Sequence, residues 1–159
     1  MTIDLLISQQ ADRRPDEVAL VCGEESLTYR ELEERTDRLA GYLRSLGVGA
    51  EKLVGVNIER SAEMVIGMLA VMKAGGGYVP LDPEYPVERL RYMAADAGLE
   101  IVLRGGAGSG ERIGGEGVEE IEIGEGWEER LGWSGRETEL EERERTSERT
   151  AYVIYTSGS

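Results

Sequence analysis

Four small residues near the end of the chain, Thr156, Ser157, Gly158 and Ser159, have the types and spacing that can bind phosphate. They directly follow Ala151–Tyr155, a compact apolar segment that is typical of a buried strand. Glycine lets a backbone approach an anion closely, successive N–H groups can point at its oxygens, and hydroxyl groups add further donors. An ordinary Ser/Gly turn has the same composition. From these residues alone, a phosphate loop and a plain turn both stay open.

Asp82 and Cys22 are two further residues of a reactive type. The sequence places no partner carboxylate or cation beside Asp82, which lies in a proline-rich segment, so we expect it to cap a turn rather than to transfer a proton. Cys22 lies in a strand-like segment, and we expect it to be a buried small apolar side chain. With one cysteine and no histidine, the chain cannot form an internal disulfide, a Ser-His-Asp triad or a His/Cys metal site.

The composition narrows the class of protein. The 159 residues include 18 basic and 32 acidic side chains, which gives a net charge of −14. Such a surface repels phosphate backbones, so we expect no nucleic-acid partner and no binding to anionic membranes. The longest apolar stretch, residues 64–72, is about half of the ~20 residues that a membrane span needs. Because the N-terminus also lacks the regions of a signal peptide, we expect a soluble, cytoplasmic protein.

Strand and helix patterns alternate along residues 1–104. Thr28 and Glu31 have the spacing of a capping box, and Ser61 can cap a helix that is apolar nearly all round and must therefore be buried. The connections are short and favour right-handed crossovers, so we expect an α/β fold whose strand-helix alternation forms a largely parallel, layered sheet. Short apolar runs between turn residues predict strands at 18–22, 26–27, 53–58, 78–79 and 100–103. Capping residues and glycine stops predict three helices. The first follows Thr28 and ends at Gly47, the second follows Ser61 and ends at Gly75, and the third covers 87–97 and ends at Gly98.

Residues 105–149 are rich in glycine and glutamate and are only weakly patterned. Most of this segment lacks the apolar surface that offsets chain entropy. We therefore expect a long, mobile and variable connection within a single domain that spans 1–159. The exceptions are the strand-like Val118, Ile121 and Ile123, and a short helix that Trp127, Leu131 and Trp133 could anchor.

Three segments carry a resemblance to a known family: LTYREL (27–32), MKAGGGYVPLDPEYP (72–86) and TAYVIYTSGS (150–159). In order and spacing they resemble the first three core motifs of the amino-acid-activating adenylation domains of nonribosomal peptide synthetases. These domains belong to the adenylate-forming, AMP-binding superfamily. The stretches RPDEVAL (14–20) and ERLRYMAADAG (88–98) also look like this family. The resemblance implies that residues 1–159 are the N-terminal part of such a domain, truncated inside its nucleotide loop.

By this resemblance, Thr156, Ser157, Gly158 and Ser159 would contact the β- and γ-phosphates of ATP, which is bound with Mg²⁺. The implied reaction joins an amino-acid carboxylate to the α-phosphorus and then passes the aminoacyl group to the phosphopantetheine thiol of a peptidyl carrier domain. The family's Mg²⁺-binding glutamate and charge-neutralising lysine have no counterpart in residues 1–159. We therefore assign no catalytic or metal-binding residue, and we expect the isolated chain to be inactive.

Two alternative functions stay open at this point. The first is a fragment of an acyl-CoA synthetase, although the GGGYVPLDPEYP segment favours the peptide-synthetase branch. The second is a non-catalytic α/β binding module. Some family members are also helped by small MbtH-like proteins, and the proline-rich turn with the helix at 87–97 is the candidate surface for such a helper.

Overall fold

The computed structural model describes residues 3–105, 110–124 and 126–128. The predicted strand Ala151–Tyr155 and the predicted phosphate-binding residues Thr156, Ser157, Gly158 and Ser159 lie outside the described residues. The elements, in chain order, are α1 (Ile3–Arg13), β1 (Val18–Cys22), β2 (Glu25–Thr28), α2 (Tyr29–Ser45), β3 (Leu53–Ile58), α3 (Ala62–Lys73), β4 (Gly77–Pro80), α4 (Val87–Asp96), β5 (Ile101–Gly105) and β6 (Glu119–Glu122).

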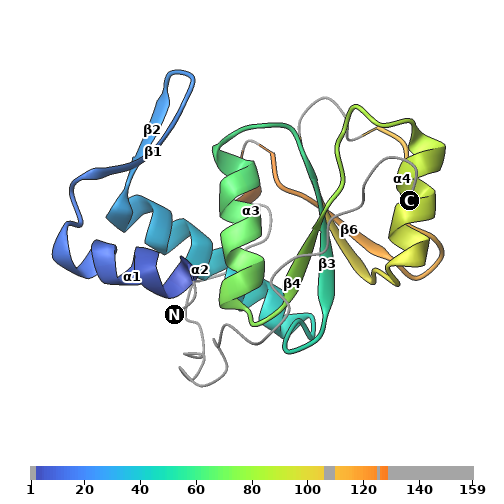
Figure 1. Cartoon of the computed structure of the whole chain (residues 1–159), viewed down its shortest axis with the longest axis horizontal. Helices are drawn as coiled ribbons and strands as arrows, with labels where there is room; N and C mark the ends of the chain where they lie inside the picture. Colours follow the sequence, from blue (N-terminus) through green and yellow to red (C-terminus); the bar gives the residue numbers. More distant parts are fainter. Residues whose placement is uncertain (1–2, 106–109, 125, 129–159) are drawn as a thin grey trace.

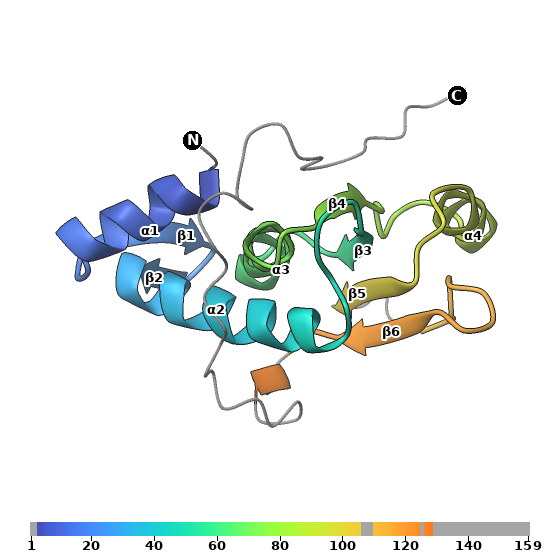
Figure 2. The ribbon, with the colours of Figure 1, turned by 90° about the horizontal axis from the view of Figure 1, so that it is seen from below.

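Four strands form a parallel sheet in the order β4-β3-β5-β6. In its register, Val54 of β3 lies opposite Tyr78 of β4 on one side and Ile101 of β5 on the other, and Ile101 in turn lies opposite Glu119 of β6. Helices α2 and α3 cover one face of the sheet, and α4 covers the other (Figures 1 and 2). This layered arrangement confirms the expected α/β fold with a parallel sheet.

Each face of the sheet buries a separate apolar cluster. Apolar side chains that alternate along the strands point to opposite faces, so β3 and β5 contribute to both clusters. Helix α3 is enclosed as expected, because its central residues Ile66, Ala70 and Val71 are all fully buried. The cluster under α2 and α3 includes Leu39, Leu43, Val54, Val56, Ile66 and Leu103. The cluster under α4 includes Val79, Leu90, Met93, Leu99, Val102 and Ile113.

The predicted helix caps are present. Thr28 Oγ1 accepts a hydrogen bond from the Glu31 N–H at 3.1 Å, and the Glu31 carboxylate accepts one from the Thr28 N–H at 3.1 Å. Ser61 Oγ accepts from the Met64 N–H at 3.2 Å. The backbone turns left-handed at the glycines that end the three helices, with φ of 96° at Gly47, 93° at Gly75 and 66° at Gly98. Local sequence signals therefore fix where these helices begin and end.

The first helix, α1, was not expected from the sequence. Its apolar residues form no buried stripe: Ile3 is 53% exposed and Leu6 is 48% exposed, whereas the buried residue is Asp4. The helix instead packs on α2, where Ser8 Oγ donates a hydrogen bond to Glu33 Oε1 at 2.8 Å. A helix held by such tertiary contacts leaves little periodic signal in its own sequence.

The predicted hairpin is present as an antiparallel pair of strands, β1 and β2. Gly23, in the turn between them, has a φ of 61°. Cys22, which we expected to be buried, is only half-buried, because β1 lies at the edge of a two-stranded sheet rather than inside a core.

The described part of the Gly/Glu-rich segment is folded onto the core, in contrast to the expected mobile connection. Strand β6 pairs with β5, with Ile121 opposite Leu103, which confirms the strand-like interpretation of this stretch. Ile113, Ile123 and Trp127 are each at most 2% exposed. A few widely spaced apolar residues are enough to hold this segment, because β5 offers an edge for strand pairing and the two apolar clusters bury the side chains. Residues 129–149 lie outside the described part.

Among the residues that the structure describes, no helix combines the length and the apolar character needed to cross a membrane.

Candidate functional site

The carboxyl ends of the parallel strands form one edge of the molecule, and the chain changes faces there. After β3 the chain enters α3 on one face of the sheet. After the neighbouring strand β5 it reaches Ile113, which belongs to the cluster under α4 on the opposite face. In open α/β sheets, ligands bind where adjacent strands lead to opposite faces, because the diverging loops leave a crevice. The carboxyl edge of the sheet, where β3 and β5 end, is therefore the candidate site.

Several hollows surround this edge, and Arg60 lines three of them. One, of about 350 Å³, lies between the ends of β3 and β4 and is lined by Ile58, Met64, Pro80 and Tyr85 among others. A second, of about 560 Å³, is bounded by Glu59, Arg60, Asp82, Pro83 and Glu84. A third, of about 290 Å³, reaches from Ser61 to Ile123 and Gly124 after β6. Sequence reasoning did not point to Arg60, because an exposed arginine after a strand has no motif of its own.

Asp82 lies at this edge but has a structural role. Its carboxylate oxygen Oδ1 accepts a hydrogen bond from the Glu84 N–H at 2.9 Å, and its carbonyl accepts one from the Tyr85 N–H at 3.0 Å. These bonds close the turn that follows β4. The turn-capping role expected for Asp82 is confirmed.

A buried polar network on the α4 face holds the loops of this edge in place. Arg104 of β5 is 5% exposed and donates to Asn57 Oδ1 of β3 at 3.0 Å and to Glu120 Oε1 of β6 at 2.9 Å. The Asn57 side chain donates in turn to the Leu81 carbonyl at 2.9 Å, and Arg104 also donates to the Glu111 carbonyl. One guanidinium thus ties three strands to the turn after β4 and to the segment before β6. Sequence reasoning missed this network because its members are far apart in the chain.

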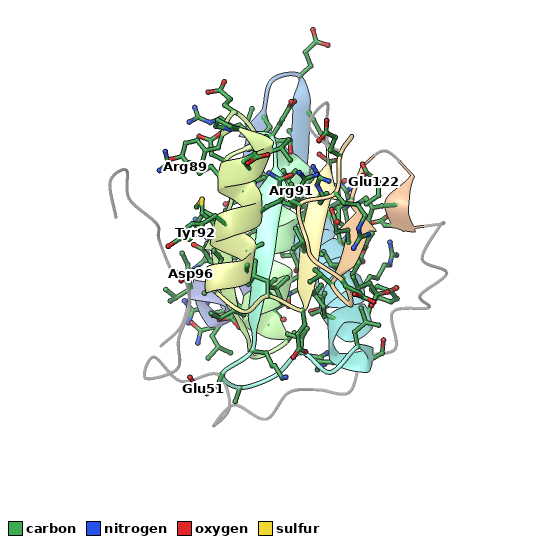
Figure 3. The ribbon with its side chains drawn as sticks, turned by 90° about the vertical axis from the view of Figure 1, so that its right-hand side faces the viewer. Glu51, Arg89, Arg91, Tyr92, Asp96 and Glu122 are labelled. Carbon is green, nitrogen blue, oxygen red and sulfur yellow. The ribbon has the colours of Figure 1, made fainter. Side chains whose placement is uncertain are left out.

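The opposite edge of the sheet is the alternative location. A hollow of about 190 Å³ lies there between the α2–β3 and α4–β5 loops, beside Glu51 and Lys52. Figure 3 shows Glu51 at the far end of the molecule from Arg89, which lies in the first turn of α4. Because this hollow lies at the amino ends of the strands, it has no crevice of diverging loops, and we do not assign it the function.

Thr156, Ser157, Gly158 and Ser159, the predicted phosphate-binding residues, lie outside the described residues, so their role stays a prediction. Within residues 3–105, 110–124 and 126–128, no group of three or more acidic or cysteine side chains could hold a metal ion. The described part of the chain supplies the parallel sheet and Arg60, which lines the hollows at its carboxyl edge.

Comparison with known proteins decides the family. Residues 7–159 match the family model of AMP-binding enzymes. The chain belongs to this family. Among curated AMP-binding relatives, tyrocidine synthase 3 of Brevibacillus parabrevis is 45% identical over 160 residues, which cover 97% of this chain and 2% of the synthase. The chain spans only about 2 to 3% of the length of the first curated relatives that it matches.

The solved structures that are similar to this chain include adenylation proteins of nonribosomal peptide synthesis. The nonribosomal peptide synthetase FmoA3 in its AMPPNP-bound form has a TM-score of 0.84 and 31% identity, covering 97% of this chain and 16% of that one. An artificially fused adenylation–PCP di-domain, NpsA-ThdA from Klebsiella oxytoca, has a TM-score of 0.82 and 26% identity, covering 98% of this chain and 28% of that one. The resemblance to adenylation domains of nonribosomal peptide synthetases is thereby confirmed.

Proposed function

We propose that residues 1–159 are the N-terminal part of an adenylation domain that activates an amino acid with ATP in nonribosomal peptide synthesis. The observation that carries this proposal is the match to AMP-binding enzymes over residues 7–159, together with FmoA3, a relative in fold whose structure contains an ATP analogue. The hollows at the carboxyl edge support it, because that is where a parallel sheet receives a nucleotide.

In this function the amino-acid carboxylate attacks the α-phosphorus of ATP, which gives an aminoacyl adenylate and pyrophosphate. Thr156, Ser157, Gly158 and Ser159 remain the proposed contacts to the β- and γ-phosphates, through N–H and hydroxyl donors. ATP carries Mg²⁺ in such reactions, and nucleotide-bound Mg²⁺ takes its ligands from one or two carboxylates together with the phosphates and water. We propose that these magnesium ligands and the catalytic groups lie in the remainder of the parent protein.

The proposed partner for the second step is a peptidyl carrier domain, whose phosphopantetheine thiol takes the aminoacyl group. The fused adenylation–PCP protein NpsA-ThdA supports this partner, because an adenylation domain and a carrier domain are joined in it. A helper protein of the MbtH type is a further proposed partner. The surface proposed for it, the turn at 80–86 with α4, presents Tyr92 at 62% exposure on the outer side of α4 (Figure 3). Because the reaction consumes ATP, we propose the cytoplasm as the compartment.

Amino-acid-dependent exchange of pyrophosphate into ATP tests the proposal. We expect exchange from the parent polypeptide with one or a few amino acids, and none above background from residues 1–159 alone, because the charge-stabilising groups are absent. Exchange that depends on a fatty acid instead would favour the acyl-CoA synthetase alternative. Turnover by residues 1–159 alone would refute the assignment of the catalytic groups to the remainder of the protein.

A matched pair of variants tests the phosphate-binding residues. In the parent protein, Ser157→Ala should lower kcat/KM for ATP by about tenfold or more, since it removes a hydroxyl donor to the phosphates. Ser147→Ala, in the neighbouring Glu-rich stretch, should leave the exchange rate unchanged. Equal rates for both variants would show that Ser157 does not contact the nucleotide.

A further inference from the structure

A row of polar side chains crosses the parallel sheet on the face that α4 covers. Asn57 of β3 and Arg104 of β5 lie opposite each other in the register, and Glu120 of β6 lies on the other side of Arg104. The side chains of Asn57 and Arg104 are both buried, although this face of the sheet otherwise buries an apolar cluster. Because polar and charged groups are costly to bury, each member of such a row depends on its partners.

Arg104 decides how the side-chain amide of Asn57 is oriented. The Arg104 guanidinium has donors only, so its Nε, which lies 3.0 Å from Asn57 Oδ1, requires the amide oxygen on that side. The amide nitrogen Nδ2 then points the other way and donates to the Leu81 carbonyl at 2.9 Å. With the amide turned over, two donors would face each other, and so would two acceptors. The bond to Leu81 therefore depends on Arg104 through Asn57.

Leu81 begins the turn that forms one wall of the hollows at the carboxyl edge. Its N–H donates to the Val56 carbonyl at 2.9 Å and its carbonyl accepts from Asn57, so β3 holds both polar groups of this residue. Leu81 and Asp82 line the hollow of about 350 Å³ together with Arg60. Asp82 and Arg60 also line the hollow of about 560 Å³. The position of this wall relative to Arg60, which follows β3, is therefore set by its bonds to β3.

The other end of the row holds the segment that connects β5 to β6. The Glu120 carboxylate pairs with Arg104 at 2.9 Å and accepts longer hydrogen bonds, of 3.4 Å, from the N–H groups of Ile113 and Gly114. Arg104 donates in addition to the carbonyl of Glu111. The same guanidinium thus orients the amide on β3 and fixes the segment before β6, so the row links the two sides of the sheet.

Stability by itself gives no reason for such a row, because replacing a buried ion pair with apolar side chains is often neutral or stabilising. We propose that Asn57 and Arg104 are positioning residues for the adenylation reaction: through the Leu81 carbonyl they hold the turn after β4 where ATP binding at the carboxyl edge requires it. The inference rests on the proposed function. Both side chains are buried, so they act on the reaction through the turn rather than by touching the nucleotide.

Two variants of the parent protein test this role in amino-acid-dependent pyrophosphate exchange. Asn57→Asp still accepts from Arg104 but has no N–H for the Leu81 carbonyl. We expect the KM for ATP to rise about tenfold while kcat changes by less than about twofold. Arg104→Lys should shift KM in the same direction, because an ammonium keeps the charge beside Glu120 but lacks the fixed fork of a guanidinium. A KM at the wild-type value in either variant that folds would overturn the inference.

Lys73→Met is the matched control, because it also breaks a buried ion cluster, but on the face under α2 and α3. Lys73 is 1% exposed and pairs with Asp37 at 2.8 Å. This variant should lower the Tm of the parent at least as far as Asn57→Asp does and leave the KM for ATP unaltered. A KM that rises in both variants in proportion to the loss of Tm would mean that lost stability, and not the position of the turn, causes the effect.

Hydrogen exchange read by mass spectrometry tests the row without any activity. In the parent protein, Arg104→Lys should speed exchange in the peptide over residues 81–86 about tenfold, while the peptide over α3 serves as an unchanged reference. Unaltered exchange at the turn would show that Arg104 does not act through Asn57, and would overturn the inference. Faster exchange at the turn in a parent that does not adenylate refutes only the proposed function. Adenylation with an unaltered turn and an unaltered KM refutes only the positioning role.

Discussion

At the scale of single residues, Lys73 is the largest fully buried side chain in the described structure. Its side chain is 1% exposed, and Nζ donates hydrogen bonds to Thr36 Oγ1 at 2.7 Å and to Asp37 Oδ1 at 2.8 Å. Glu33 Oε2 lies 2.9 Å from Nζ as an ion-pair partner. A buried ammonium is tolerated only where partners of this kind replace water.

Removing this cation should be costly. Lys73→Met keeps the apolar stem but leaves the carboxylates of Glu33 and Asp37 uncompensated, so we expect a loss of about 3 kcal/mol in the free energy of unfolding. Lys52→Met is the matched control: its pair with Glu100 is exposed and 3.5 Å long, and we expect a loss below about 0.5 kcal/mol. Urea titrations measure both values. Equal losses would show that the buried network contributes nothing beyond a surface ion pair.

Glu51 has a backbone conformation that is unfavourable for a residue with a side chain. Its φ is 64°, and it lies in a turn where the Lys52 N–H donates to the Gly49 carbonyl at 3.1 Å. Because a left-handed conformation strains any residue with a Cβ, Glu51→Gly should raise stability by about 0.5 to 1 kcal/mol. Glu34→Gly, at an exposed position in α2, should lower it by about 1 kcal/mol. Thermal unfolding that shows a loss for both variants would refute the strain at Glu51.

At the scale of elements, the turn between α3 and β4 depends on close backbone approach. A Cβ built on Gly76 would lie 2.9 Å from the Lys52 carbonyl oxygen, and the Gly77 N–H donates to that same oxygen at 2.8 Å. Since neither backbone can give way easily, Gly76→Ala should cost about 2 kcal/mol. Gly49→Ala faces open space and should be close to neutral. A neutral Gly76→Ala in urea titrations would mean that the α3–β4 turn can shift.

Sequence signals predicted the elements whose ends are fixed locally. The capping box of Thr28 and Glu31 and the cap at Ser61 each depend on residues three apart, so they can be read from a short window. The parallel sheet followed from the alternation of strands and helices. These signals were sufficient for the fold class.

Features that depend on distant residues could not be predicted in the same way. The Lys73 cluster joins α3 to α2, and the Arg104 network joins β5 to β3 and β6, at sequence separations of up to 47 residues. Helix α1 likewise gains its stability from tertiary contacts rather than from its own pattern, whereas the strand-like Ile121 did indicate β6. For the candidate site, the sequence named the residues at 156–159, whereas Arg60 became apparent only once the structure showed the hollows at the carboxyl edge of the sheet.

At the scale of the whole molecule, the net charge of −14 is a source of repulsion. The surface ion pairs, such as Arg30 with Asp16, are exposed and contribute little. When salt screens both kinds of interaction, the stability gained from weaker repulsion between acidic side chains should therefore exceed the stability lost from weaker ion pairs. We expect the Tm of the chain to rise when NaCl is increased from about 20 to 200 mM, where the Debye length falls below about 10 Å. A falling Tm in differential scanning fluorimetry would show that attractive pairs dominate.

The product that the parent protein makes from ATP is the most direct test of an AMP-binding, amino-acid-activating function. Incubation with ATP, Mg²⁺ and a mixture of amino acids, followed by mass spectrometry, should detect an aminoacyl adenylate and one pyrophosphate for each adenylate formed. Release of ADP and inorganic phosphate, or an absence of any amino-acid-dependent cleavage of ATP, would contradict the assignment.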